Sequence, residues 1–325
     1  ALSVVSAAGG IVFASTQGVI PMLAEPCYNV SDFSREIKEE PMKDYEIIDA
    51  HIHLTQSLEE EANYWTVPGR RDEDRWANPE RVITYMDKSG IAKMAFMILI
   101  PRQYRAPIFE KARLMALPEA QRREKVKKLS EEIAALQKKY NEWGCGVGRS
   151  QPRLVPFIGM STDFGDAKAI LQEFELRVKQ GAKGIKMHPG MYSFYPGDEA
   201  LFPMYEKCQE LGLPVLADSG PWPHSHELVL FPLWFKMPEP HTEYAEPLNF
   251  ALVLKAFPRL KVVLAHLGSA WWDERVELAQ KYANVYFDTS QGFSAPDRIP
   301  VVPHRSLAEE DAVRVIRKIG VKRVM

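Results

Sequence analysis

The sequence predicts an α/β protein of the (β/α)8 TIM-type barrel class, with the chain ending within the eighth strand. From Glu46 onward, short apolar runs alternate with amphipathic segments, which is typical of parallel strands joined by helices. Histidine or aspartate follows most of these runs, as expected where a barrel gathers its active site at the carboxyl ends of its strands. The expected strands are residues 46–50, 93–100, 154–160, 183–187, 213–217, 261–265, 284–287 and 321–325.

The segments between these runs carry helix start and stop signals. Asn78 followed by Pro79 is typical of a helix N-cap, and Gly90 suits the left-handed residue that ends a helix. Asp166 and Gly212 suit a helix start and a helix end in the same way. The expected helices are residues 79–89, 167–180, 201–211, 247–257, 271–282 and 307–319.

Two segments interrupt the alternation. Residues 118–141 form a long charged stretch inside a helical insertion, residues 106–150, and its charges are expected on a solvated face. Residues 221–247 hold six prolines and several aromatic residues. They are expected to form a long loop over one end of the barrel, either a functional lid or a plain surface excursion. One domain, residues 26–325, therefore accounts for the pattern.

Residues 1–25 are apolar but diluted by Gly, Ala and Ser, and the first charged residue is Glu25. This composition predicts the remnant of an export signal cut within its start, and hence an exported or periplasmic protein. The alternative is an ordinary buried N-terminal segment of a cytoplasmic protein. The stretch is too interrupted for a membrane span.

The composition restricts the partners. The 325 residues are 46% hydrophobic and 26% charged, with a net charge of −2. This balance gives no electrostatic reason to expect nucleic acid or an anionic membrane as a partner. A small-molecule substrate is expected, and the chain can form a homo-oligomer. Three cysteines are too few for a disulfide framework or a cysteine-based zinc site.

Metal-ligating and acid/base residue types stand at the ends of the expected strands. His51 and His53 are two residues apart, so both side chains point to the same face of a strand and can hold one divalent ion. The alternative is that they make ordinary hydrogen bonds. His266 precedes a Leu-Gly pair and suits proton transfer or the polarisation of a carbonyl group.

The remaining candidates have less definite roles. His188 could be a metal ligand or a substrate contact, or could hold its own loop. Lys186 lies on the same face as His188 and could act as an acid/base or, once carboxylated, as a metal bridge. Asp288 and Asp49 could each orient a histidine, and Asp288 could instead cap the following turn.

Several motifs together resemble the amidohydrolase superfamily, and more narrowly its amidohydrolase-related branch, which includes aminocarboxymuconate-semialdehyde decarboxylase-like and dicarboxylate lactonase-like enzymes. The resemblance implies a metal-dependent (β/α)8 barrel in which His51 and His53 bind the metal and His266 contacts substrate or assists proton transfer. The motifs are Ile48-Asp-Ala-His-Ile-His53, Gly181-Ala-Lys-Gly-Ile-Lys-Met-His-Pro189, Gly212-Leu-Pro-Val-Leu-Ala217, Phe257-Pro-Arg-Leu-Lys-Val-Val-Leu-Ala-His-Leu-Gly268 and Asn284-Val-Tyr-Phe-Asp-Thr-Ser290.

The sequence departs from the family pattern at two places. Asp218 stands where the family usually has a metal-binding histidine, so either this carboxylate binds the metal or the site is depleted and His188, His224 or His226 compensates. The family's metal-binding aspartate after strand eight would come after Met325.

These observations predict a metal-dependent hydrolase or decarboxylase that acts on a small carboxylate or carbonyl compound. The expected cofactor is a divalent ion, zinc first and manganese second. The alternatives are a non-catalytic barrel that binds a ligand, and a binuclear phosphoesterase-like site that includes a carboxylated Lys186. The expected site comprises the metal ligands His51, His53 and Asp218, the catalytic residues His266 and Asp288, and the substrate contacts His188, Trp222 and His226.

Overall fold

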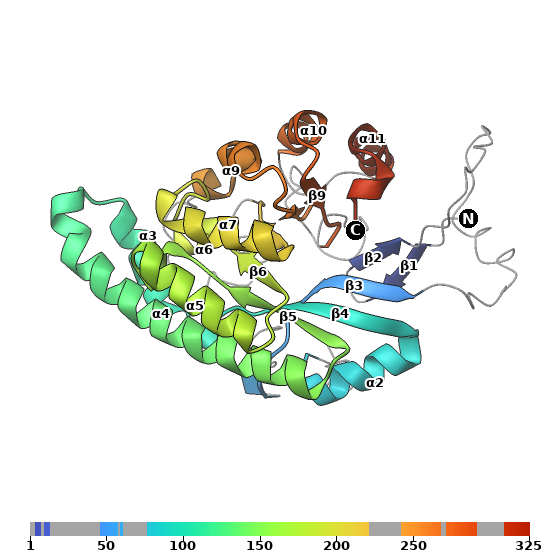
Figure 1. The fold of residues 1–325 in the computed structure, drawn as a ribbon, viewed down its shortest axis with the longest axis horizontal. Helices are drawn as coiled ribbons and strands as arrows, with labels where there is room; N and C mark the ends of the chain where they lie inside the picture. The colour runs from blue at the N-terminus through green and yellow to red at the C-terminus, as the bar shows by residue number, and fades with distance from the viewer. Residues whose placement is uncertain are drawn as a thin grey trace, which may run out of the picture.

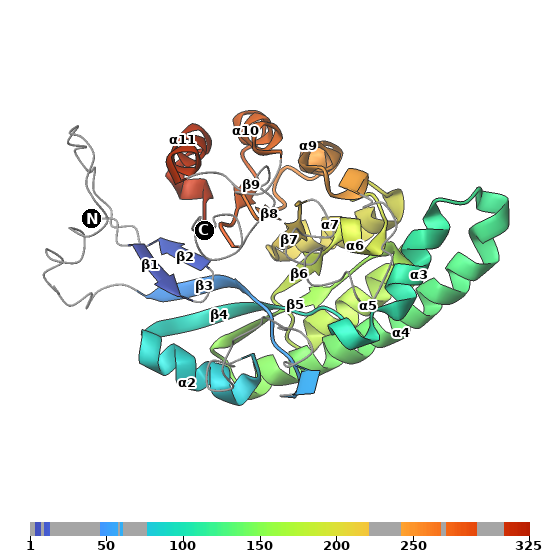
Figure 2. The same ribbon diagram turned by 180° about the vertical axis from the view of Figure 1, so that it is seen from behind.

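The computed structural model describes residues 4–7, 10–13, 46–57, 59–60, 77–220, 242–267, 271–290 and 309–325. Within these residues, seven parallel strands form one sheet in which each strand pairs with the next one along the chain. The sheet curls, and helices follow it around its outer face (Figures 1 and 2). The strands are β3 (Ile47–Ile52), β4 (Ile91–Met97), β5 (Leu154–Gly159), β6 (Gly184–Met187), β7 (Val215–Asp218), β8 (Val262–Ala265) and β9 (Val285–Phe287).

Seven of the eight expected strands are thus confirmed, and the eighth is wrong as a regular strand. Residues Val321–Arg323 form a 3-10 turn, and Val324 makes a single parallel bridge to Phe287 of β9. The amide of Met325 donates to the carbonyl of Phe287 at 2.8 Å, and the amide of Thr289 donates to the carbonyl of Met325 at 3.0 Å. The segment therefore takes the position of the next barrel strand beside β9 through the extended residue Val324, without forming a regular strand.

The helix termini follow the local chemistry. The side chain of Asn78 accepts a hydrogen bond from the amide of Arg81 at 2.9 Å, and Gly90 ends the helix in the left-handed region at φ 67°. Asp166 caps its helix through the amide of Ala169 in the same way. The outer helices are α2 (Pro79–Ser89), α5 (Ala167–Lys179), α7 (Phe202–Leu211), α9 (Ala251–Ala256), α10 (Trp272–Lys281) and α11 (Glu309–Ile319).

Short 3-10 and helical turns fill several of the connections, and the helix expected over residues 247–257 is split into a 3-10 turn and α9. These turns are η2 (Arg102–Tyr104), η3 (Thr162–Phe164), α6 (Pro189–Tyr192), η4 (Glu199–Leu201), η5 (Thr242–Ala245) and η6 (Pro247–Phe250).

The insertion after β4 is a pair of packed helices, α3 (Ala106–Met115) and α4 (Glu119–Ser150). α4 is 32 residues long and continues well past the expected end at residue 141. Two glycines let this helix approach the sheet closely: a Cβ at Gly144 would overlap the side chain of Ile98, and one at Gly148 would come within 2.7 Å of Pro156. The charged residues of α4 lie mostly exposed, as the sequence predicts.

The apolar interior has two parts. A large cluster fills the space between the sheet and the helices. A smaller cluster lies on the other face of the strands, inside the curl. Side chains alternate along a strand, so Asp218 shares this inner face with Leu216. The smaller cluster contains Ala95, Met97, Phe157, Leu216, Val263 and Ala265.

Near the N-terminus, β1 (Val4–Ala7) and β2 (Gly10–Phe13) pair as an antiparallel hairpin. The export signal predicted over residues 1–25 stays a prediction. Most of the expected lid, residues 221–241, and with it Trp222, His224 and His226, lies outside the described residues. Among the helices that the structure describes, none is long and apolar enough to cross a membrane.

Candidate metal and active site

The candidate residues come from the carboxyl ends of five strands and converge in one buried network. His51 lies in β3 and His53 follows it, Lys186 lies in β6, and Asp218 is the last residue of β7. His188 is the N-cap of α6, directly after β6. His266 and Asp288 follow β8 and β9. The strand ends therefore position every candidate that the structure describes, as a parallel barrel requires.

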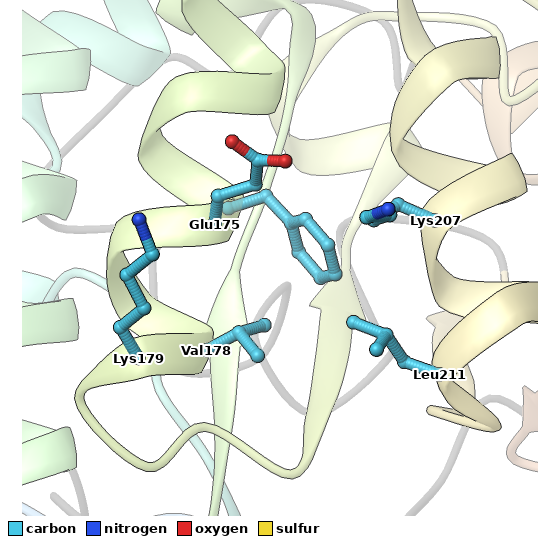
Figure 3. A pocket seen from close by; sticks show the side chains of 6 residues that line it. Glu175, Val178, Lys179, Lys207 and Leu211 are labelled. Atoms are coloured by element: carbon cyan, nitrogen blue, oxygen red, sulfur yellow. The ribbon is translucent and has the colours of Figure 1, made fainter.

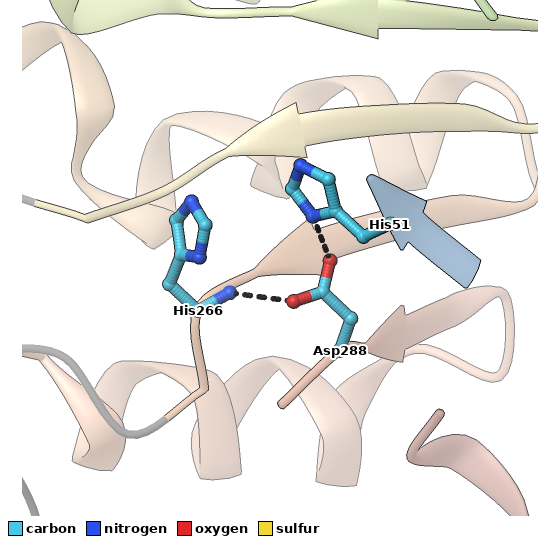
Figure 4. Close-up of side chains that lie close together, drawn as sticks. All are labelled: His51, His266 and Asp288. Atoms are coloured by element: carbon cyan, nitrogen blue, oxygen red, sulfur yellow. Dashed lines mark hydrogen bonds and ion pairs between the residues drawn. The ribbon is translucent and has the colours of Figure 1, made fainter. Parts of the chain in front are cut away.

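His51 is held from three sides. Its Nδ1 lies 2.8 Å from Oδ2 of Asp288 (Figure 4), its Nε2 lies 3.3 Å from Nζ of Lys186, and its backbone amide donates to Asp49. The Lys186 ammonium can only donate, so the lone pair of His51 is on Nε2 and the proton is on Nδ1.

His53 has the same tautomer. Its Nδ1 lies 3.2 Å from the carbonyl oxygen of Met97, an acceptor, so Nδ1 carries the proton. The rings of His51 and His53 lie 5.2 Å apart between their centroids. The two imidazoles thus present Nε2 lone pairs from neighbouring positions.

His266 has both ring nitrogens against oxygen atoms. Nδ1 lies 2.7 Å from the carbonyl oxygen of Ser290, and Nε2 lies 2.9 Å from Oδ2 of Asp218. The 2.9 Å contact places one proton between Nε2 of His266 and the carboxylate of Asp218. The His266–Asp218 pair therefore shares a proton.

Asp218 also contacts His188. Its Nδ1 accepts a hydrogen bond from the amide of Met191 at 3.3 Å, so in the neutral ring the proton is on Nε2, which lies 3.4 Å from Oδ2 of Asp218. His188 and His266 both place Nε2 against the same atom, Oδ2 of Asp218. In this geometry Asp218 is the residue that links the strand-end histidines of β6 and β8.

Asp288 is the acceptor for several donors. It binds Nδ1 of His51, the backbone amide of His266 at 3.0 Å, and both the amide and the hydroxyl of Ser290, at 3.1 and 2.6 Å. The contact to the His266 amide holds that residue at φ 64°, a left-handed conformation that is rare for a non-glycine residue. Such strain persists where the surrounding structure fixes it, often at a functional site.

Burial controls the charge states of these groups. Burial lowers the pKa of His51 to about 4 and, with the charges of His51 and Lys186, lowers the pKa of His53 well below its ordinary value of 6.5. Burial would raise the pKa of Asp288, but the charge and hydrogen bond of His51 outweigh it and lower that pKa below its ordinary value. At neutral pH, His51 and His53 are thus neutral and Asp288 is ionised.

Cations surround the site as well. Burial lowers the pKa of Lys186, an effect that the charges of Asp218 and Asp288 oppose. Arg275 is fully buried, and one of its Nη atoms donates to the carbonyl oxygen of Ser219 at 2.6 Å, next to Asp218. Burial lowers its pKa to about 10, so the guanidinium stays charged at neutral pH.

The donor set fits a divalent ion. His51, His266 and Asp288 each offer one ligand atom, and these atoms lie within 4.8 Å of one another. Two imidazoles and a carboxylate are ligand types that zinc and manganese accept. Among the described residues, no other three histidine, cysteine or carboxylate side chains bring their ligand atoms this close together. The ligands expected from the sequence, His51, His53 and Asp218, share only His51 with it.

Sequence reasoning missed three contributors. Ser290 lies 3.0 Å from Nδ1 of His51 and 3.1 Å from Nδ1 of His266. A signal was present, because Ser290 stands two residues after Asp288. Ser219 likewise stands directly after Asp218, at the end of β7, whereas Arg275 gave no such signal because it belongs to the helix that precedes β9.

A pocket on the outer surface is unrelated to this network. It lies between α5 and α7 (Figure 3), and no candidate site residue contributes to it. It is lined by Phe174, Glu175, Val178, Lys179, Lys207 and Leu211.

Comparison with known proteins identifies the class. The family described as Amidohydrolase matches residues 48–325, so the chain belongs to the amidohydrolase family. Comparison with curated protein sequences gives no significant match. The family resemblance is therefore confirmed, and the chain is an enzyme of the class of divalent-metal-dependent hydrolases and carboxy-lyases. The non-catalytic alternative is not favoured.

Solved structures agree on the fold. An uncharacterized TIM-barrel protein from Bordetella bronchiseptica is 16% identical, with 75% of each chain covered and a TM-score of 0.50. The 2,6-dihydroxybenzoate decarboxylase from Rhizobium is 15% identical, with 86% of this chain and 85% of that chain covered and a TM-score of 0.52. A dihydroxybenzoic acid decarboxylase from Polaromonas sp. JS666, described with bound manganese and the inhibitor 2-nitroresorcinol, is 17% identical, with 86% and 84% covered and a TM-score of 0.53.

Proposed function

We propose that this enzyme is a divalent-metal-dependent decarboxylase of a small hydroxylated aromatic carboxylate. The observation that carries the proposal is the His266–Asp218 pair, which shares a proton beside two histidines that present Nε2 lone pairs. Decarboxylation needs such a proton: when the bond between the ring carbon and the carboxylate breaks, the electron pair stays on the carbon, which then takes up a proton as CO2 leaves. The similar folds of two dihydroxybenzoate decarboxylases support the substrate class.

We assign the metal ligands to Nε2 of His51, Nε2 of His53 and the carboxylate of Asp218. The hydrogen bonds favour this set, because the Nδ1 atoms of both histidines already face oxygen atoms. In this assignment Asp288 orients His51, and His266 is left to move the proton. When bound, the ion would polarise a substrate oxygen. Manganese is supported by the Polaromonas structure, and zinc is the competing occupant.

The charges around the network support an anionic substrate. Three cations interact with the histidines and aspartates of the site, and three carboxylates balance their charge. A divalent ion would add two positive charges to this balance, and a substrate carboxylate with a neighbouring oxygen anion would offset them. The groups are Lys186, Arg275 and Arg105, and Asp49, Asp218 and Asp288.

The substrate contacts are proposed from the sequence. His188 lies against Asp218. Trp222 and His226, in the proline-rich segment of residues 221–247, are proposed to contact the substrate. A fall in affinity for substrate in Trp222→Ala with unchanged metal content tests this role.

The central experiment measures metal content and CO2 release together. The protein, freed of metal with a chelator, is titrated with Mn²⁺ and then incubated with 2,6-dihydroxybenzoate. We expect about one equivalent of bound metal and CO2 release in the wild type, loss of both in His51→Ala, and no change in Lys207→Ala, a control on α7 whose side chain is 40% exposed. A wild type that binds no divalent metal would refute the proposal.

Two further results separate the alternatives. Metal affinity lost in His266→Gln and kept in His53→Gln would replace our ligand assignment by the compact set of His51, His266 and Asp288. Hydrolysis of an ester or lactone without CO2 release would make the enzyme a hydrolase of the same family.

We further propose, from the sequence alone, that the protein is exported, that residues 26–325 form one domain, and that it forms a homo-oligomer. Cell fractionation, limited proteolysis and the mass in solution test these three points in turn.

A further inference from the structure

A ladder of buried amide groups on α4 reaches the carboxyl ends of two neighbouring strands. Gln137 and Asn141 are one helical turn apart and therefore share a face, and they are 2% and 0% exposed. Nε2 of Gln137 donates to Oδ1 of Asn141 at 3.1 Å. A Cβ at Gly159 would overlap the amide of Gln137, so glycine is required where the ladder meets the sheet.

The ladder first contacts the end of β4. Nε2 of Gln137 donates to the carbonyl oxygen of Ile98 at 3.3 Å. Ile98 directly follows Met97, whose carbonyl oxygen lies 3.2 Å from Nδ1 of His53. The peptide that fixes the tautomer of His53 is thus adjacent to the one that Gln137 holds.

The ladder then closes the end of β5. Oδ1 of Asn141 accepts from the amide of Gly159 at 2.8 Å, and Nδ2 of Asn141 donates to its carbonyl oxygen at 3.0 Å. Gly159 pairs with Lys186 of β6. Asn141 therefore holds the residue that stands beside the lysine of the site.

The third contact is to the turn after His188. The hydroxyl of Tyr192 donates to Oε1 of Gln137 at 3.0 Å, and the amide of Tyr192 donates to the carbonyl oxygen of His188 at 3.0 Å. Lys111 of α3 binds the carbonyl oxygen of Tyr192 at 2.8 Å and the buried carboxylate of Asp163 at 2.5 Å. Both helices of the insertion thus make hydrogen bonds to the turn that follows His188.

We infer that Gln137 is a positioning residue that sets His53 and His188 together, so that the insertion of residues 106–150 forms part of the active site. This rests on the proposed function, in which His53 binds the metal and His188 faces the substrate. One amide group joins the peptide beside the His53 acceptor to the hydroxyl of Tyr192, so moving it displaces both histidines. Loss of a partner that orients metal ligands typically weakens metal binding about 10–100-fold.

The test compares two near-isosteric deletions of a buried amide. Gln137→Met removes the ladder contact, and Asn284→Leu is the matched control. Asn284 donates to the carbonyl oxygens of Phe257 and Leu260, both at 3.0 Å, and precedes β9, so it lies at the opposite end of the strands. Urea unfolding of both variants shows whether their losses of stability are matched.

The first measurement is NMR of the metal-free protein labelled with ¹³C-histidine, with the ring signals assigned through His53→Gln and His188→Gln. We expect Gln137→Met to shift the signals of His53 and His188 and Asn284→Leu to leave both in place. Tyr192→Phe, which removes only the hydroxyl contact, should move the signal of His188 and leave that of His53. Unchanged signals in Gln137→Met, or equal shifts in Asn284→Leu, overturn the inference.

The second measurement is the dissociation constant for Mn²⁺. We expect a rise of about 10–100-fold in Gln137→Met and less than a twofold change in Asn284→Leu. If the wild type binds Mn²⁺ and Gln137→Met binds it with the same affinity, the positioning role is refuted but the proposed function is not. A wild type without metal binding refutes the proposed function, while shifted histidine signals in Gln137→Met still support the positioning role.

Discussion

Replacing Asp288 by asparagine should reverse the tautomer of His51 without changing the shape of the site. Oδ1 of Asp288 accepts from the amides of His266 and Ser290 and from the hydroxyl of Ser290, whereas Oδ2 faces Nδ1 of His51. The asparagine must keep its oxygen toward the three donors, because its amino group cannot accept from them. That amino group then donates to Nδ1 of His51, and the histidine proton moves to Nε2, which can then no longer accept from Lys186.

The magnitude follows from these contacts. A protonated Nε2 cannot bind a metal, so we expect the Mn²⁺ dissociation constant of Asp288→Asn to rise about 10–100-fold. The metal-free protein should lose about 1.5–3 kcal/mol of unfolding free energy, the typical value of one hydrogen bond to a charged group. Asp49→Asn is the matched control, since Asp49 accepts only from the backbone amide of His51 at 3.1 Å among the contacts described for it.

The assays are Mn²⁺ titration and ¹⁵N NMR of labelled histidine, which reports the nitrogen that carries the proton. An Asp288→Asn variant that keeps the proton on Nδ1 and binds Mn²⁺ like the wild type would show the reasoning to be wrong. Weaker binding with an unchanged tautomer would instead make Asp288 a direct ligand. The control should behave like the wild type in both assays.

Three further predictions concern stability and reactivity. Burial lowers the pKa of His51 to about 4 from its ordinary 6.5, so the unfolded chain takes up the proton first. The metal-free protein should therefore lose up to about 3 kcal/mol of unfolding free energy as the pH falls from 6.5 to 4. Urea titrations that give the same unfolding free energy across this pH range contradict the prediction. Lys111→Met removes the ammonium that pairs with the buried carboxylate of Asp163, so chemical denaturation should show a loss of about 3–5 kcal/mol of unfolding free energy. A loss below about 1 kcal/mol is evidence against this prediction. Burial raises the pKa of Cys145 to about 11, so iodoacetamide should modify it far more slowly in the native protein than in urea, as read by peptide mass spectrometry; equal rates disprove this.

The sequence predicts the strands and caps well because their causes are local. A strand buried on both faces is an apolar run wherever it lies, and β5 and β8 are examples. Asn78 and Asp166 cap their helices with their own side chains, and Gly90 and Gly212 supply the left-handed residue that ends a helix. None of these features depends on a distant contact.

The extent of α4 could not be predicted in the same way. Glycines at positions 144, 146 and 148 disfavour a helix by about 1 kcal/mol each relative to alanine. The helix nevertheless continues to Ser150, because Gly144 and Gly148 allow its backbone to pack against the sheet. Packing between distant segments therefore overrides the local preference.

The residue types of the site were readable, but their pairing was not. His51, Asp218, His266 and Asp288 stand at strand ends, and the parallel topology alone brings them to one face. Which carboxylate meets which imidazole depends on the curvature of the sheet. The left-handed backbone of His266 adds to this, since it lets both ring nitrogens face oxygen atoms.

The ladder on α4 shows why a helix that is charged over most of its surface can still belong to an active site. Gln137 and Asn141 lie among lysines and glutamates, and their spacing alone does not distinguish a buried amide pair from a solvated one. Their burial follows from Gly159, which has no Cβ to keep the amide of Gln137 away from the sheet. Because the same amide reaches the peptide beside the His53 acceptor and the turn after His188, we expect a change in this helix to alter the positions of both histidines. Variation in the insertion would then tune the chemistry without touching any residue that binds the substrate.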